Sequence, residues 1–267
     1  MRRRDFCKSL GLAAAGAVAA PGAVAAGLGS TGRSRPNLVY IFADQFRLHA
    51  LGLWRDAAFR GAIQTQADPV HTPNLDRLAR GGRVFTQACS THPLCSPHRA
   101  MLMSGMYPAS NGVMHMNCRN GRDLGLRHDI TCLTDVLAGA GYETAYIGKT
   151  HWERTEPLFD ANNRYVGTAD PPGGHYANNF DTYIPPGPGR HGNGYWFQNI
   201  GDRHKDPLSY SSRPELVAGK PDGTPHRHRR FTPRQEADIA IEFLRNESAQ
   251  RDPSRPFSLI WSPNPPH

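Results

Sequence analysis

NLVYIFADQ, residues 37–45, is the stretch from which the fold can be inferred first. Residues 38–43 are all apolar, and a continuous apolar run of this length is typical of a strand buried on both faces of a parallel sheet. The run ends at Asp44. Ligands of open α/β sheets gather at the carboxyl ends of the strands. We therefore expect a central, buried strand here, followed by a functional carboxylate at Asp44.

Further strands and helices are predicted along the chain. Apolar runs predict strands at residues 144–147 and 257–261, and a short strand-like piece at 84–85. Helices are predicted from Thr72-Pro73 to Gly81-Gly82, over 100–104 and 130–139, and from the capping box at 232–235. The expected inward side chains of these helices are Leu75, Leu78, Ala79, Leu133, Val136, Leu137, Ala237, Ala240, Ile241 and Leu244. The alternation of strand and helix predicts an α/β layered fold.

Residues from about 153 to 228 show no clear periodicity. They are rich in Gly, Pro, Asn and His, as in DPPGGHYANNF at residues 170–180. A long segment without secondary structure inside a domain is usually functional. We expect these residues to form loops that shape a substrate site.

Composition is consistent with a globular chain that binds an anion. The 267 residues are 38% hydrophobic and 20% charged, and the formal net charge is +8. The first 25 residues carry four basic side chains and one acid, so their removal lowers the charge by 3 to +5. This charge fits an anionic substrate. No basic helix with interleaved aromatic residues is found, so we expect no nucleic-acid partner.

The N-terminus has the pattern of an export signal. Residues 3–8, RRDFCK, fit a twin-arginine motif, an Ala-rich apolar stretch spans 10–20, and Ala-Val-Ala at 23–25 is a small-x-small cleavage site. We predict a signal peptide over 1–25 and a linker over 26–34. Export through the bacterial twin-arginine (Tat) machinery would place the protein in the periplasm or outside the cell. A single-pass anchor and a chance basic start remain alternatives.

Four cysteines follow the predicted signal peptide, which contains Cys7: they are Cys89, Cys95, Cys118 and Cys132. An exported protein can form disulfides, so two bridges are one possibility. If Cys95 is chemically modified, at most one intrachain pair can form. The sequence does not determine which cysteines would pair.

Cys95-Ser-Pro-His-Arg99 places a cysteine at the start of a helix led by Pro97. Free backbone N–H groups and the positive end of the helix lie there, and Arg99 follows one turn later. Such surroundings stabilise an anion and would lower the pKa of a thiol. A buried structural cysteine is the alternative reading of the same residues.

Several segments resemble the sulfatase family. Cys95, Pro97, Arg99 and Gly105 match its Cys-x-Pro-x-Arg signature, and GYETAYIGKTHW at 141–152 is similar to its second signature. RPNLVYIFADQ and HTPNLDRLARGGRVFTQA resemble the family's first strand and first helix, in the same order. The resemblance implies an alkaline-phosphatase-like, three-layer α/β/α sandwich with a mostly parallel central sheet. Residues 35–267 would be the N-terminal portion of the catalytic domain, which is incomplete at its C-terminal end.

The resemblance also implies a modified nucleophile at Cys95. In the family, a formylglycine-generating enzyme oxidises the signature cysteine to an aldehyde. The aldehyde hydrate carries two hydroxyl groups on one carbon. One attacks sulfur, and the other later loses a proton and expels sulfate, which restores the aldehyde.

A divalent metal is implied as a second cofactor. Asp44 matches the family's first metal ligand, and residue 95 faces the same ion. Most members have a second aspartate next, where this sequence has Gln45. An amide oxygen can coordinate a cation but brings no charge. Oxygen ligands suit Ca²⁺ or Mg²⁺, and we expect Ca²⁺.

The remaining catalytic residues also follow from the resemblance. Arg99 would hold the aldehyde hydrate, Lys149 would bind a sulfate oxygen, and His151 would hydrogen-bond the hydrate. SPNPPH at 262–267 is similar to a family segment whose histidine protonates the leaving oxygen, which assigns that role to His267.

The expected function is hydrolysis of sulfuric esters in a sulfated small molecule or polysaccharide. The family's other metal ligands and a further active-site lysine would lie beyond His267, so we expect residues 1–267 alone to be inactive. One alternative is a phosphonate or phosphodiester hydrolase of the same superfamily. Another is a non-catalytic remnant that only binds.

Overall fold

Residues 35–64, 66–117, 123–155, 181–200 and 204–267 are described by the structure, which is a computed structural model. The predicted signal peptide and linker lie outside these residues. The chain divides into two units, Met1–Pro36 and Asn37–His267. Among the described residues, no helix has the length and apolar character needed to cross a bilayer.

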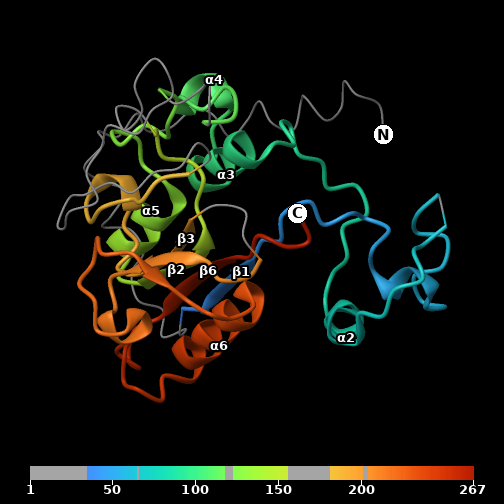
Figure 1. Ribbon diagram of the computed structural model, residues 1–267. Coiled ribbons are helices and arrows are strands. Elements are labelled where there is room, and N and C mark those ends of the chain that lie inside the picture. Colours follow the sequence, from blue (N-terminus) through green and yellow to red (C-terminus); the bar gives the residue numbers. More distant parts are fainter. Residues whose placement is uncertain (1–34, 65, 118–122, 156–180, 201–203) are drawn as a thin grey trace, which may run out of the picture. The chain divides into compact units, whose positions relative to one another are not determined.

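A six-stranded sheet forms the centre of the Asn37–His267 unit. Its order is β1-β6-β2-β3-β4-β5 (Figure 1). The strands are β1 Leu38–Ile41, β2 Glu143–Lys149, β3 Tyr195–Ile200, β4 Leu208–Ser211, β5 His226–Arg227 and β6 Phe257–Ser262. Strands β1, β6, β2 and β3 pair in parallel, whereas β4 and β5 are antiparallel. Parallel pairing brings the carboxyl ends of β1, β6 and β2 to one edge of the sheet.

The described residues contain five α-helices. They are α2 Pro73–Gly81, α3 Cys95–Ser104, α4 Pro108–Asn111, α5 Leu133–Gly139 and α6 Thr232–Arg245, with 3₁₀ turns at Gly52–Arg55, Pro188–Arg190 and Pro214–Val217. Figure 1 shows α6 on one face and α3 and α5 on the other. The layers are therefore helix, sheet and helix, as predicted.

Two apolar cores follow from the alternation of side chains along the strands. The core on the α3 side includes Ala100, Met103, Tyr146, Trp196 and Ile260. The core on the α6 side includes Ile147, Phe197, Ile239, Phe243 and Leu259. Both faces of β2, β3 and β6 are thus buried, and this explains why their sequences are continuously apolar or aromatic.

The predicted central position of the first strand is wrong for the described part of the chain. β1 pairs only with β6 and forms an edge of the sheet. Its four residues are 39–57% exposed. A continuous apolar run therefore identified the strand correctly, but the run alone could not determine which neighbours would cover it.

The predicted helices are present, but several side chains that were expected to be buried are exposed. α2 begins with Pro73 after Thr72, as expected, but Leu75 and Leu78 are exposed. In α5 the buried residue is Thr134, whereas the expected Leu133 and Val136 are exposed. In α6 the buried apolar residues are Ile239, Ala240 and Phe243, and Ile241 is exposed. Contacts with the sheet fix the rotation of each helix, and a short apolar pattern fits more than one rotation.

The predicted long loop region contains three strands. β3, β4 and β5 all lie within 153–228, and every residue of β3 is buried. The aromatic run of β3 at residues 195–197 has the composition of a strand, but neighbouring Gly and Pro obscured it. Residues 156–180 of the same region lie outside the described residues. The strand expected at 84–85 is absent, and Phe85 is exposed.

Gly148 is required by the fold, and its replacement tests this. Its φ is +112°, and an added Cβ would lie 2.3 Å from the Ser262 carbonyl oxygen of β6. We expect Gly148→Ala to lower the free energy of unfolding by about 2–4 kcal/mol or to prevent folding. Urea denaturation followed by circular dichroism measures the change.

Gly139→Ala is the matched control. Gly139 ends α5, and no atom lies within 4 Å of its added Cβ. Alanine should leave stability unchanged or raise it by about 0.5–1 kcal/mol. Equal unfolding midpoints for the two variants would contradict the steric argument.

Candidate active site

Asp44 lies at the carboxyl end of β1, where the sequence predicted a functional carboxylate. Its backbone N–H donates to the Pro263 carbonyl oxygen at 3.3 Å, which ties it to the segment after β6. The side chain is buried, with the residue only 5% exposed. A buried carboxylate requires charged or hydrogen-bonding partners.

Two cations hold the Asp44 carboxylate. Lys149 Nζ donates to Oδ2 at 3.0 Å, and the Arg99 guanidinium donates to the same oxygen at 3.1 Å. Burial alone would raise the pKa of Asp44, but the charges and hydrogen bonds of Lys149 and Arg99 outweigh it and lower the pKa to about 2. The carboxylate therefore stays ionised at neutral pH.

Cys95 is the first residue of α3, and its side chain faces this carboxylate. Sγ lies 3.5 Å from Asp44 Oδ2 and 3.8 Å from Lys149 Nζ. The structure thus brings together residues 44, 95 and 149. Contrary to the expectation of an acidified thiol, burial raises the pKa of Cys95, although the charges of Lys149 and Arg99 oppose it. The thiol is therefore protonated at neutral pH and donates to Asp44.

Arg99 is almost completely buried one turn along α3. It donates to the Lys149 carbonyl oxygen at 2.9 Å and to Ser262 Oγ, in addition to Asp44. Its guanidinium carbon lies 4.8 Å from the centre of the Phe42 ring. The Arg99 side chain thus connects α3 to the ends of β1, β2 and β6, and it also makes a cation–π contact with Phe42.

Lys149 ends β2, and Asn264 holds it from the other side. Nζ donates to Asn264 Oδ1 at 3.0 Å as well as to Asp44. Asn264 lies in the SPNPPH segment, but the sequence argument singled out only the histidine there. Among the described residues around the thiol, two buried cations contact one carboxylate. Cations in such a site can bind an oxygen of an anionic ligand.

A pocket of about 460 Å³ opens onto Cys95. Asp44, Gln45, Cys95 and His267 all line it. Gln45 and His267 are exposed. His151 is buried, with its backbone in the left-handed region at φ 57°, and does not line the described part of this pocket. The structure therefore groups six predicted residues: Asp44 with Cys95, Arg99 and Lys149 in contact with it, and Gln45 and His267 at the same pocket.

The oxygen atoms at this pocket suit a hard divalent cation. Asp44 Oδ1, whose carboxylate is ionised, lies 3.7 Å from Cys95 Sγ, and Gln45 provides an amide at the same pocket. Ca²⁺ and Mg²⁺ prefer such carboxylate and amide oxygens. Asp44 and Gln45 are the residues that could hold the predicted metal, together with an oxygen substituent on residue 95.

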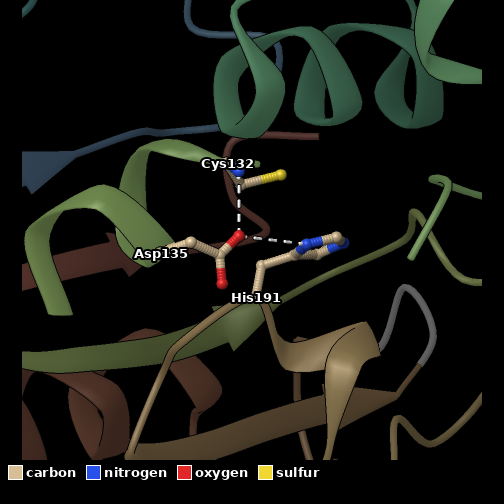
Figure 2. Close-up of side chains that lie close together, drawn as sticks. All are labelled: Cys132, Asp135 and His191. Carbon is tan, nitrogen blue, oxygen red and sulfur yellow. Dashed lines mark hydrogen bonds and ion pairs between the residues drawn. The ribbon is translucent and has the colours of Figure 1, made fainter. Parts of the chain in front are cut away.

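A second group of metal-ligand types lies elsewhere, at the start of α5. Single ligand atoms of Cys132, Asp135 and His191 lie within 4.8 Å of one another. Figure 2 shows the Asp135 carboxylate linking the Cys132 amide at 2.8 Å to His191 Nδ1 at 3.4 Å. The Cys132 thiol caps the same helix. Because each side chain already has a partner, we interpret this group as a link that fastens residues 188–194 to α5.

The chain is similar to known sulfatases. The sulfatase family model matches residues 36–267. An endo-4-O-sulfatase of Bacteroides thetaiotaomicron is 39% identical over 235 residues, which are 87% of this chain and 43% of that protein. A ulvan-active sulfatase of Formosa agariphila is 41% identical over 119 residues, or 44% of this chain and 20% of that protein. This chain therefore spans less than half the length of these relatives.

A solved sulfatase structure from Bacteroides thetaiotaomicron, described under the metabolism of multiple glycosaminoglycans, matches with a TM-score of 0.73 and 38% identity. The match covers 88% of this chain and 45% of the solved one. It confirms the predicted alkaline-phosphatase-like α/β fold with its mostly parallel sheet. With a family model matched over nearly all of the second unit and a relative at 39% identity, the chain belongs to the sulfatase family.

Proposed function

We propose that this protein is a sulfuric ester hydrolase that acts on sulfated glycans. The observation that carries the proposal is the contact of Cys95, Arg99 and Lys149 with one buried carboxylate, Asp44, at a pocket open to a ligand. The endo-4-O-sulfatase and the ulvan-active sulfatase among its relatives support a glycan substrate.

Each residue has a role that its position supports. Lys149 Nζ, 3.8 Å from Cys95 Sγ, would bind an oxygen of a sulfate group brought to residue 95. Arg99 would keep Asp44 and Lys149 in place, because it donates to both. His267 at the pocket mouth would donate a proton to the departing sugar oxygen. His151, which is buried two residues after Lys149, would hydrogen-bond the aldehyde hydrate at residue 95.

Residue 95 would be active as formylglycine, made by a formylglycine-generating enzyme. When present, the hydrated aldehyde supplies two hydroxyl groups on one carbon, one to attack sulfur and one to release sulfate as the carbonyl returns. The divalent metal, for which we propose Ca²⁺, would neutralise sulfate charge. Asp44 and Gln45 would hold it. Residues 1–267 alone would be inactive, because the resemblance implies further metal ligands beyond them.

The proposed location is the periplasm or the exterior of a bacterial cell. The twin-arginine pattern at residues 3–8 supports export by the Tat machinery, which carries folded proteins. This route would allow the aldehyde to be made in the cytoplasm before export. Phosphonate or phosphodiester hydrolysis is the competing activity, and the absence of a second acidic residue at Gln45 is the feature that keeps it open.

Lys149→Ala tests the role of the lysine in the complete gene product. We expect kcat on an aryl sulfate to fall about 100-fold or more, because a preorganised charge at the reacting group is lost. Lys220→Ala is the matched control, since its ammonium donates to the Pro225 carbonyl oxygen and does not line the described part of the pocket at Cys95. Full activity of Lys149→Ala would contradict the assignment. Faster turnover of an aryl phosphodiester than of the sulfate by the wild type would favour the competing activity.

Mass spectrometry of the peptide that contains Cys95 tests the modification. In protein isolated from its native host, we expect a peptide whose mass corresponds to an aldehyde in place of the thiol. The aldehyde should react with a hydrazide probe, and Cys95→Ser should not. A fully unmodified thiol in the native protein would count against catalysis and favour a binding role.

Removal of the metal provides a separate test. Dialysis of the complete gene product against a chelator should abolish turnover, and Ca²⁺ should restore it better than Mg²⁺. Asp44→Asn should weaken Ca²⁺ binding and also destabilise the fold, because Arg99 and Lys149 would lose their shared anion. Undiminished activity in the chelator would exclude the metal from the mechanism.

A further inference from the structure

Glu236 is a completely buried acid on α6, behind the candidate active site. Its Oε2 accepts from Trp261 Nε1 at 3.1 Å, and its Oε1 accepts from Asn199 Nδ2. Both donors are neutral N–H groups. Burial raises the pKa of Glu236 to about 7, although these hydrogen bonds and the charge of Arg99 oppose it.

The two donors belong to the strands on either side of β2. In the register of the sheet, Asn199 of β3 lies beside Lys149, and Trp261 of β6 lies beside Ile147. Between them, a Cβ added to Gly148 would lie 3.3 Å from Glu236 Oε1. The carboxyl group of Glu236 therefore contacts side chains of β3 and β6 and lies close to Gly148 of β2. Gly148 directly precedes Lys149, which binds Asp44.

Both oxygens of Glu236 act as hydrogen-bond acceptors in this position. Ser209 Oγ donates to Asn199 Oδ1, which fixes the Asn199 amide so that its NH₂ points to Glu236. The indole N–H of Trp261 is likewise fixed as a donor. Two donors need two acceptor oxygens, and glutamine would turn an NH₂ toward one of them. An acid is costly to bury, and apolar residues in place of Glu236 and of both donors would avoid that cost.

We infer that Glu236 is a positioning residue that sets the ends of β2 and β6, and through them Lys149 and Ser262, for catalysis. Ser262 follows Trp261 directly and accepts from Arg99, so both active-site cations depend on strands that Glu236 joins. Glu236 itself does not line the pocket onto which Cys95 opens. The inference rests on the proposed function and adds a residue from α6, an element that the sequence argument did not connect with the site.

The test is Glu236→Gln in the complete gene product. A misplacement of about 1 Å can cost about 100-fold in rate, so we expect kcat per aldehyde-containing enzyme to fall about tenfold or more. The fall should be the same for an aryl sulfate and a sulfated oligosaccharide, because Lys149 would bind the sulfate and not the sugar. The urea midpoint should be lower, because an NH₂ would face a buried donor, so kcat is compared per folded enzyme. Asp238→Asn, an exposed acid on the same helix, should leave kcat unchanged.

A crystal structure of the variant separates this inference from the proposed function. The Lys149 Nζ to Asp44 Oδ2 distance, 3.0 Å here, should exceed about 3.5 Å in Glu236→Gln. If the wild type cleaves no sulfate ester, the proposed function fails, and the distance still decides the positioning role. An unmoved Lys149 with wild-type kcat would overturn the inference. Loss of activity explained by a lower folded fraction, again with Lys149 unmoved, would also overturn it.

Should Glu236→Gln not fold, Trp261→Phe provides the same test. This change keeps the ring at β6 but removes the donor to Glu236 Oε2. We expect a loss of kcat in the same direction and a smaller shift of Lys149. Wild-type kcat in a folded Trp261→Phe protein would contradict the inference.

Discussion

The buried carboxylate of Asp44, shared by Lys149 and Arg99, is the interaction on which the site depends. It joins three segments far apart in the sequence: the end of β1, the end of β2 and the first turn of α3. Each of these charges would be costly to bury alone. Because both cations converge on a single oxygen, loss of the carboxylate would take a shared anion from two buried positive charges, whereas loss of one cation would leave the other paired with Asp44.

This ion group also explains why the strand ends are arranged as they are. Arg99 donates to the Lys149 carbonyl and to Ser262. Its hydrogen bonds therefore depend on the positions of β2 and β6 as well as on that of Asp44. Gly148 allows the two strands to approach, since any side chain there would strike the Ser262 carbonyl. The close spacing of β2 and β6 at Gly148 therefore also determines the position of Lys149, the next residue.

Much of this could be predicted from the sequence, and the reasons for the rest are physical. Apolar runs revealed β1, β2 and β6, and the resemblance of two short motifs brought Asp44, Cys95, Arg99 and Lys149 together. The aromatic strand β3 was missed because Gly and Pro around it suggested loops. Asn264 and Glu236 were missed for a different reason. A polar residue that acts by touching another side chain has no local pattern, and its partners are revealed only by the packing of the sheet.

The protonated state of Cys95 is informative about what residue 95 is suited to do. Burial keeps the thiol neutral despite two nearby cations, and it donates to Asp44 at 3.5 Å. A neutral thiol is a poor nucleophile. Instead, the Asp44 carboxylate can accept a hydrogen bond from residue 95. Lys149 and Arg99 provide positive charge for an anion bound near residue 95. A hydroxyl group would be a stronger donor to that carboxylate than the thiol is. The surroundings thus suit an oxygen-bearing side chain better than the encoded cysteine, in accord with the proposed conversion to an aldehyde hydrate.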